Sequence, residues 1–136
     1  LEAAPTDYQV NDSGKEVEWG CSSTGTGVGA GATAIGTGKT NTAKIIANCA
    51  TAGIAADVAN KYSTSAAGAG QWFLPSKDEL HAMWTNKDAI GGFVDDYYWS
   101  SSENPPYAGW FEIFPYGQQY AGGKYWAHYV RPVRAF

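Results

Sequence analysis

Residue types that could carry hydrolytic chemistry are few in this chain of 136 residues. The candidates are the serine triplet Ser100–Ser102 and the two histidines, His81 and His128. A serine nucleophile of the α/β-hydrolase type sits in a G-x-S-x-G turn between a strand and a helix, and no such pattern surrounds the triplet. Neither histidine has a partner at the spacing of a zinc-binding helix. We therefore expect no catalytic residue, no metal ligand and no enzymatic activity.

The segment Gly36–Thr40, with the sequence Gly-Thr-Gly-Lys-Thr, resembles the end of a phosphate-binding loop. The full pattern, G-x-x-x-x-G-K-[ST], requires a glycine at position 33, where this chain has Thr33, and no hydrophobic strand precedes it. We interpret the segment as a Gly-rich loop that enters a helix. We expect no nucleotide and no other cofactor.

Oxygen-donor side chains occur in two short pairs, Asp95-Asp96 and Glu103-Asn104. Carboxylate and amide oxygens are the ligands that calcium takes in proteins, which leaves a calcium site as an alternative. Paired aspartates in a loop more often cap a helix or a turn. We favour that structural role.

Cys21 and Cys49 are the two cysteines of the chain. With the two histidines they could supply four zinc ligands, but the short C-x-x-C and paired-histidine spacings of zinc sites are absent. In a low-charge chain rich in Gly, Ser, Thr and Asn, two cysteines favour one disulfide in an exported protein. Closing that loop stabilises a fold by about 3 kcal/mol in the chain-entropy model. Two buried free thiols are the alternative.

Aromatic residues are concentrated at the end of the chain, where residues 97–136 hold 13 of the 20. They stand among Gly, Ala, Pro and Asn, which is the composition of a protein-binding surface with rigid anchors and small spacers. A Tyr-rich sheet core is the alternative, but Gly and Pro interrupt too many of these stretches for all to be interior strands. The residues that we expect to contact a ligand are Tyr107, Phe111, Ile113, Tyr116, Tyr120, Tyr125, Trp126 and His128.

Only about half of any strand can face outward, so some of these eight residues must lie in the core. We assign Trp99, Trp110 and Phe114 to packing. The net charge is −4 and no cluster of Lys and Arg is present, so we expect no nucleic-acid partner. No apolar run approaches the roughly 20 residues that span a bilayer, so we expect no membrane span.

Two helices are predicted to position these residues. Apolar residues recur at intervals of three and four over Thr42–Tyr62, which predicts one helix that Gly53 interrupts at a cost of about 1 kcal/mol. A second helix is predicted over about Lys77–Thr85, because Ser76 and Glu79 form the capping box that typically precedes a helix.

Strands are predicted outside the helices, at residues 16–19, 72–74, 98–102, 110–114, 125–129 and 130–134. Two helices followed by a run of antiparallel strands is an α+β order rather than a βαβ order. The length suits one domain over residues 1–136 with a sizeable core. We therefore expect an α+β fold in which two helices support an antiparallel sheet.

Several motifs occur in order along the chain and together resemble one family. They are the segments Trp19–Cys21, Ala34–Thr42, Cys49 with Gly53–Ala56, Trp72–Leu80 (containing LPSKDEL), Tyr98–Glu103 (YWSSSE) and Tyr129–Phe136 (containing VRPVRAF). Residues 17–136 resemble the domain family typified by the C-terminal domain of the Legionella collagen-like adhesin. The resemblance implies an exported protein at a cell surface or on a phage particle. It also implies a C-type-lectin-like fold with the termini close together and a C-terminal ligand-display region, in which a strand near Trp19 pairs in the same sheet as the terminal strand.

Some members of that family are variable proteins of diversity-generating retroelements, which rewrite the 3′ end of a gene with errors at adenines. Randomising an AAC-type codon yields Tyr, Gly, Ala, Pro, Phe, Ile, His, Ser and Asp, but not Trp, Gln, Glu, Lys or Met. Residues 104–128 are mostly of the reachable kind, which predicts a variable region there. Four residues match fixed positions of the family, Trp110, Phe114, Gly117 and Lys124, whereas Trp126 departs from the pattern.

The resemblance and the aromatic composition together predict a non-enzymatic display domain that binds a protein or a host-surface ligand. A glycan-binding adhesin is the alternative. Sulfated glycans are anionic and require a basic patch, which a chain with a pI of about 5.0 does not favour. An enzyme related to the formylglycine-generating enzymes is the third possibility. It is disfavoured because the chain has no pair of thiols close in sequence and no catalytic constellation.

Overall fold

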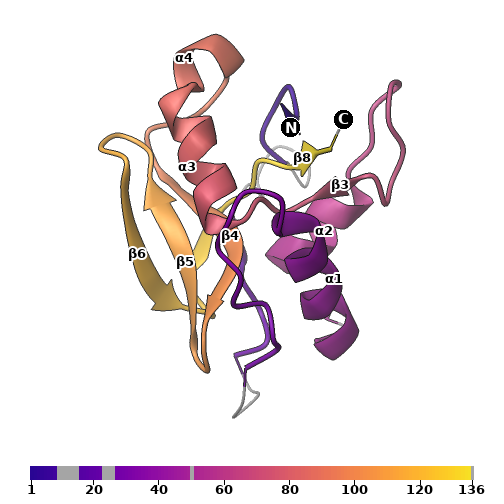
Figure 1. Ribbon diagram of the computed structural model, residues 1–136, viewed down its shortest axis with the longest axis vertical. Helices are drawn as coiled ribbons and strands as arrows, with labels where there is room; N and C mark the ends of the chain where they lie inside the picture. The colour runs from indigo at the N-terminus through magenta and orange to yellow at the C-terminus, as the bar shows by residue number, and fades with distance from the viewer. Residues whose placement is uncertain (9–15, 23–26, 50, 136) are drawn as a thin grey trace.

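The computed structural model describes residues 1–8, 16–22, 27–49 and 51–135 and confirms an α+β architecture (Figure 1). The helices are α1 (Gly38–Asn48), α2 (Ala55–Lys61), α3 (Lys77–Thr85) and α4 (Lys87–Ile90). The strands are β1 (Glu2–Ala3), β2 (Glu16–Glu18), β3 (Trp72–Phe73), β4 (Tyr97–Asn104), β5 (Ala108–Ile113), β6 (Gln118–Gly123), β7 (Ala127–Tyr129) and β8 (Val133–Arg134).

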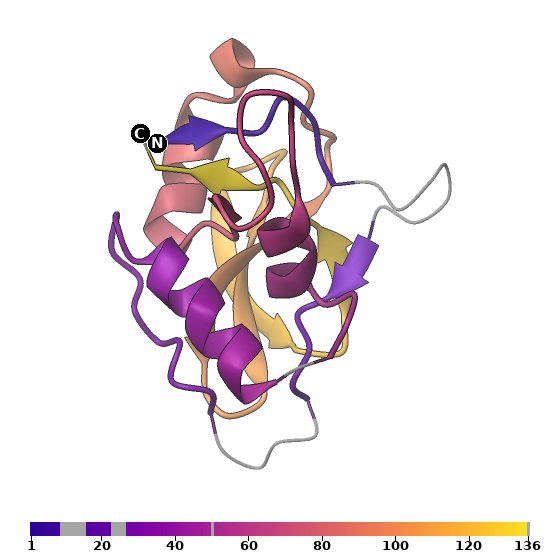
Figure 2. The same ribbon diagram turned by 90° about the vertical axis from the view of Figure 1, so that its right-hand side faces the viewer.

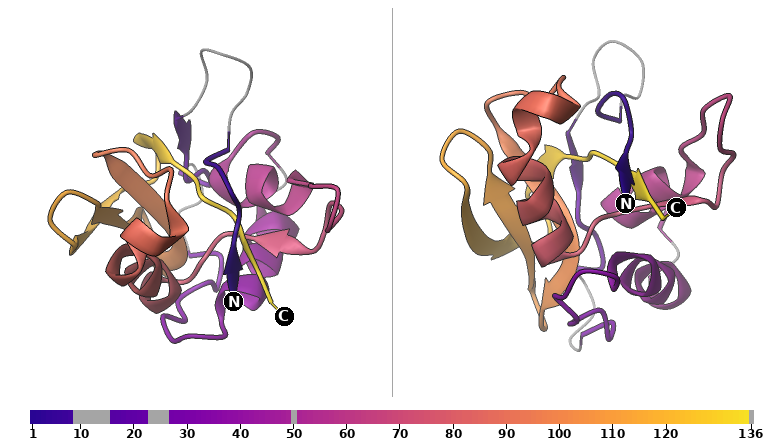
Figure 3. Two further views of the ribbon diagram at one scale, coloured as in Figure 1. Left: turned by 90° about the horizontal axis from the view of Figure 1, so that it is seen from above. Right: turned by 45° about the horizontal axis from the view of Figure 1, so that its top comes forward.

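The strands form two sheets. The larger has the order β2-β7-β4-β5-β6 and the smaller the order β1-β8-β3. All pairs are antiparallel except β4 with β7. The β5–β6 hairpin lies on one side of β4, whereas α1 and α2 lie on the other (Figures 1 and 3).

The single helix predicted over Thr42–Tyr62 is wrong, because the chain forms α1 and α2 in that region. α1 ends at Asn48, and Gly53 has a φ of +86°, a left-handed conformation that glycine adopts without strain. The Asp57 carboxylate accepts a hydrogen bond from the Gly53 amide (2.9 Å) and so supports the start of α2. Both helices bury apolar residues in the same core, which explains why the apolar periodicity ran across the break.

The Gly-rich segment Gly36–Thr40 enters a helix, as predicted, because α1 begins at Gly38. A Cβ atom on Gly38 would collide with the Glu79 carboxylate and would lie 2.9 Å from the Leu74 carbonyl oxygen. This glycine therefore allows α1 to pack closely against the start of α3.

The capping box of α3 is confirmed. The Ser76 amide donates to Glu79 Oε1 (2.7 Å), and the Ser76 hydroxyl accepts from the Glu79 amide (3.3 Å). The other Glu79 oxygen accepts from the Gly36 amide (2.9 Å), so one buried carboxylate joins two helix starts. The short helix α4 was not predicted.

Three strand predictions need correction. β6 runs through Ala121–Gly123, where the glycines had argued against a strand. The predicted strand over residues 130–134 is reduced to β8. The strand near Trp19, β2, pairs with β7 rather than with the terminal strand, and it is β1 that pairs with β8. This last pairing brings the two ends of the chain side by side (Figure 2).

The predicted disulfide between Cys21 and Cys49 is present, with the two Cα atoms 5.5 Å apart. It ties the segment after β2 to the end of α1. Cys21 lies in the main hydrophobic core and Cys49 packs against it. The bond between them stabilises the fold by restricting the unfolded chain.

Candidate ligand-display surface

Five of the eight predicted contact residues are exposed on the surface of the region 104–128. The exposed fractions are 61% for Tyr107, 73% for Tyr116, 49% for Tyr120, 66% for Tyr125 and 44% for Trp126. Ile113 is partly buried. A solvent-exposed aromatic side chain forgoes the free energy of burial, so five of them on one short segment make this segment the candidate binding surface.

Phe111 and His128 are buried, with 5% and 7% exposure, so they do not lie on the surface as predicted contacts would. The reason is strand alternation, because both side chains point to the side of the sheet where Trp99 packs. The ring centroid of His128 lies 4.7 Å from that of Phe111 and 4.4 Å from that of Trp99. These two residues support exposed rings from below.

Five neighbouring rings form what we call the aromatic patch: Tyr97, Phe111, Tyr120, Trp126 and His128. Tyr97, Tyr120 and Trp126 are exposed, and Phe111 and His128 are buried beneath them. From the centroid of Phe111 the distances are 5.3 Å to Tyr97, 6.4 Å to Tyr120 and 6.3 Å to Trp126. The rings come from β4, β5, β6, β7 and the loop before β7. The topology thus gathers residues up to 31 positions apart in sequence into one surface.

Gly122 fixes the position of Trp126 in the aromatic patch. A Cβ atom on Gly122 would lie 2.7 Å from ring atoms of both Phe111 and Trp126. The indole therefore rests where this strand has no side chain, and any larger residue would displace it.

Tyr107 and Tyr116 lie outside the aromatic patch, at the two ends of β5. Tyr107 precedes the strand, and its carbonyl accepts from the Lys124 amide (3.0 Å). Tyr116 belongs to the β5–β6 turn, where its amide donates to the Ile113 carbonyl (3.1 Å). Tyr125 also lies outside the aromatic patch, with its ring centroid 6.4 Å from that of Trp126. The display surface therefore consists of the aromatic patch and three flanking tyrosines, Tyr107, Tyr116 and Tyr125.

A buried ion pair holds this region in place. Lys124 and Glu103 are both buried, and Lys124 Nζ donates to Glu103 Oε2 at 2.6 Å. The same carboxylate accepts from the Val28 amide (2.8 Å), and the ammonium lies 4.8 Å from the ring centroid of Trp19. Removing one partner of such a pair leaves a buried charge, so the pair fixes the segment between β6 and β7 against the segments that hold Glu103 and Val28.

A second buried network fixes the end of the chain. Arg131 donates to Asp7 (2.7 Å) and to the carbonyls of Ala4 (3.2 Å) and Gly91 (3.0 Å). The Tyr98 hydroxyl donates to Asp7 (2.6 Å), and burial together with this bond raises the pKa of Tyr98. Arg131 therefore has a structural role.

The opposite face of β5 packs against α3 through polar contacts. Glu112 is fully buried and its Oε1 lies 2.7 Å from Nδ1 of the exposed His81. Burial raises the pKa of Glu112 to about 7, against the opposing effects of His81 and Lys77. Lys77 also lies 4.9 Å from the ring centroid of Trp110, and its carbonyl accepts from Gln119 (2.7 Å).

The other groups considered for chemistry have structural partners. Ser100 and Ser102 donate their hydroxyls to backbone carbonyls, of Trp110 (2.7 Å) and Ala32 (2.8 Å) respectively. Within the described part of the chain, no group of three or more His, Cys, Asp or Glu side chains is placed to hold a metal ion. No helix there is long and apolar enough to cross a bilayer.

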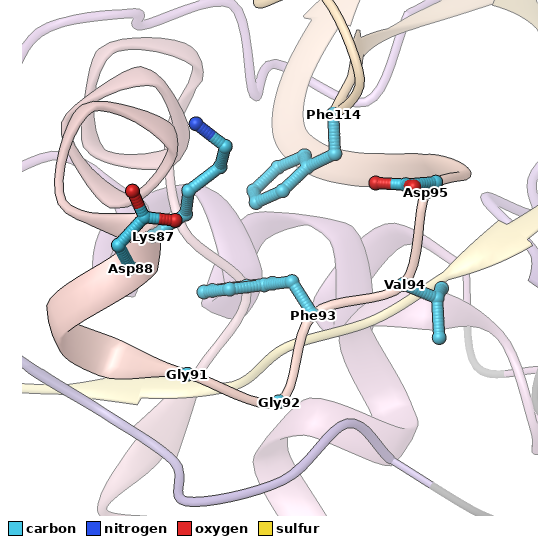
Figure 4. A pocket seen from close by; sticks show the side chains of 8 residues that line it. All are labelled: Lys87, Asp88, Gly91, Gly92, Phe93, Val94, Asp95 and Phe114. Atoms are coloured by element: carbon cyan, nitrogen blue, oxygen red, sulfur yellow. The ribbon is translucent and has the colours of Figure 1, made fainter.

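Two cavities lie away from the aromatic patch. One, of about 280 Å³, has the rings of Phe93 and Phe114 in its wall, with Lys87 and Asp88 on one side and Asp95 on the other (Figure 4). The other, of about 250 Å³, lies between Leu1, α3 and β8. Neither cavity contains a predicted contact residue.

Tyr97 is the member of the aromatic patch that the sequence missed; it is 39% exposed and stacks on Phe111. The predicted strand, residues 98–102, stopped one residue short of Tyr97; β4 begins at Tyr97, which shares a side of the strand with Trp99 two residues later. The carboxylate of the neighbouring Asp96 accepts a hydrogen bond from the Tyr97 amide (2.8 Å). The predicted turn-capping role of the paired aspartates fits that bond.

Neither a family model nor a curated protein sequence matches this chain. The function is therefore inferred from the geometry of the display surface.

Proposed function

We propose that this chain is a non-enzymatic ligand-binding domain of C-type-lectin-like architecture, which binds a protein or a host-surface ligand through residues 104–128. One observation carries the proposal. Five large aromatic side chains are exposed on a segment that a buried ion pair, Lys124 with Glu103, and a hydrogen bond from Gln119 to the Lys77 carbonyl hold to the rest of the fold. An exposed aromatic on a rigid support loses little conformational freedom on binding, which is the property of an interface anchor.

The architecture supports the C-type-lectin-like part of the proposal. The ends of the chain pair through β1 and β8, helices flank the sheets, and a C-terminal hairpin extends from the central strand β4 (Figures 1 and 2). These are the features that the family resemblance led us to expect, apart from the pairing of β2.

The distribution of residue types supports a variable protein of a diversity-generating retroelement. Six residues of 104–128 are out of reach of a randomised AAC codon, and four of them contact structural partners: Trp110 with Lys77, Glu112 with His81, Gln119 with the Lys77 carbonyl and Lys124 with Glu103. The other two, Gln118 and Trp126, are exposed. Tyr107, Tyr116, Tyr120 and Tyr125 are reachable, and all are exposed. Gly117, a fixed position of the family, has a φ of +74° and leaves room for the Trp84 ring.

The exported location fits the disulfide, which forms and persists in oxidising compartments. We propose on this basis, and on the family resemblance, that the domain lies at a cell surface or on a phage particle.

Alanine substitution tests the display function. The triple variant Tyr107→Ala, Tyr116→Ala and Tyr120→Ala should keep the melting temperature of the parent, because all three side chains are exposed, and should lose capture of surface proteins from candidate host cells. Ile35→Ala is the matched control, since Ile35 is 57% exposed outside this region. Unchanged capture by the triple variant would refute the display surface. Capture of sugars on a glycan array, with no protein partner, would favour the adhesin alternative.

Comparison of sister genes tests the retroelement. We expect copies that differ only within codons 104–128, at reachable positions, next to a reverse-transcriptase gene and a template repeat. Differences spread evenly along the gene would contradict it.

A further inference from the structure

Cations stack on tryptophan rings throughout this chain. Four of the six tryptophans carry a Lys or Arg within 5.4 Å of the ring centroid: Trp19, Trp72, Trp84 and Trp110. Of the other two, Trp99 is fully buried and Trp126 is 44% exposed. Among the described residues, Trp126 is thus the one exposed indole without an internal cation.

Trp126 stands in an electron-rich surface. Tyr97, Tyr120 and Trp126 are 39–49% exposed, and all three rings lie within 6.4 Å of the centroid of Phe111. The face of an aromatic ring is the negative part of its quadrupole, and Trp attracts a cation most strongly.

A carboxylate lies beside the aromatic patch, because Asp96 precedes Tyr97 and accepts a hydrogen bond from the Tyr97 amide (2.8 Å). Lys124, between β6 and β7, is buried in an ion pair with Glu103. Burial lowers the pKa of His128 to about 4, against the smaller opposing effect of the Asp96 carboxylate. The floor of the aromatic patch is therefore neutral at physiological pH, with a carboxylate beside it.

The shape favours a flat cation. Tyr97, Tyr120 and Trp126 are each more than a third exposed, so the aromatic patch presents an open surface. A guanidinium is planar, weakly hydrated and able to stack on an open ring while it donates to a carboxylate, whereas a compact ammonium gains most in an enclosed site.

We propose that the aromatic patch receives an arginine side chain of a partner protein, with the guanidinium against Trp126 and Tyr120 and near the carboxylate of Asp96. This inference rests on the display function proposed above and names the chemistry of the partner. The flanking Tyr107 and Tyr125 then contact the surface around that arginine.

Peptide titration followed by NMR tests the proposal. The probe is acetyl-Gly-Arg-Gly-amide, and the readout is the indole N–H resonance of Trp126. A citrulline peptide is the matched control, because citrulline keeps the planar shape without the charge. We expect saturable shifts with the arginine peptide and shifts at least about fivefold smaller with citrulline, as expected when one cation–π contact is lost. Equal shifts from the two peptides, or none from arginine, would overturn the proposal.

Variants locate the site on this face. Asp96→Asn should weaken the arginine peptide about two- to fivefold, the effect of one exposed charge contact. Tyr120→Ala should weaken it by a similar factor, and Ile35→Ala should leave it unchanged. Gly122→Ala, which displaces Trp126, should abolish the shift, and thermal melting checks that each variant is folded. Affinity that survives both Gly122→Ala and Tyr120→Ala would overturn the site.

Two further results would also reject the arginine proposal. Choline that binds more tightly than the arginine peptide would overturn the arginine assignment in favour of a lipid headgroup. If the arginine peptide fails while the parent protein still captures a partner that the triple tyrosine variant loses, the display function stands and the arginine inference falls.

Discussion

Glu112 and His128 are buried residues whose pKa values are shifted by burial in opposite directions. Burial raises the pKa of Glu112 from 4.5 to about 7 and lowers that of His128 from 6.5 to about 4. Between pH 4.5 and 7 the folded chain keeps the Glu112 proton that the unfolded chain releases, so stability falls as pH rises. Between pH 6.5 and 4 the unfolded chain takes up a His128 proton that the folded chain refuses, so stability falls as pH drops.

Glu112→Gln should stabilise the protein at pH 8 and have little effect at pH 4. The amide keeps an acceptor for His81 but has no charge to bury, so the difference from the parent should grow by about 1.4 kcal/mol per pH unit between 4.5 and 7. Urea unfolding at a series of pH values measures it. A variant less stable than the parent at pH 8 would show that the ionised carboxylate stabilises the fold.

His128→Phe should show the opposite pH dependence. It removes the group whose protonation favours the unfolded chain, so its stability relative to the parent should increase as the pH falls from 6.5 to 4, again by about 1.4 kcal/mol per unit. In the parent the two slopes oppose each other between pH 4.5 and 6.5. A constant difference between variant and parent over that range would mean that His128 titrates normally in the fold.

At the scale of elements, the break between α1 and α2 depends on one glycine. Gly53→Ala should lower the free energy of unfolding by about 1 kcal/mol, because alanine is strained in the left-handed conformation that Gly53 adopts. Gly68→Ala is the matched control, since a Cβ at Gly68 meets no atom and no positive φ is present. Equal unfolding midpoints for the two variants would contradict the account of this break.

The ion pair beside β6 should be the costliest contact to break. Lys124→Met leaves the Glu103 carboxylate buried without its cation and should destabilise the fold by about 3–5 kcal/mol. Adding Glu103→Gln removes the stranded charge and should recover much of that loss. If the double variant is no more stable than Lys124→Met, the cost lies in packing against Trp19 rather than in the charge.

At the scale of the whole molecule, local signals predicted local structure. The capping box at Ser76 and Glu79, the disulfide and the alternating strand at Trp110 involve contacts or patterns that the sequence displays directly. The break at Gly53 was underestimated because apolar spacing continued on both sides of it. β6 was missed because Gly122 looks like a strand breaker, whereas it is a glycine that makes room for the Trp126 ring.

The sequence predicted which residues belong to the candidate site, but only partly how they are arranged. Alternation places Phe111 and His128 below the surface, but which half of a strand faces outward depends on where the helices pack, and that is a long-range property. Tyr97 joins Phe111 only because β4 and β5 are neighbours in the sheet. Likewise, pairing of β1 with β8 depends on the Arg131 network, whose partners are more than 120 residues apart.

Photo-crosslinking tests the display surface most directly. Benzoylphenylalanine placed at position 120 or 125 should crosslink to one common partner on candidate host cells, because both side chains are exposed on the display surface. The same residue at position 35 serves as the control and should yield no such adduct. Adducts that form equally from all three positions, or only from position 35, would contradict a ligand-binding role for residues 104–128.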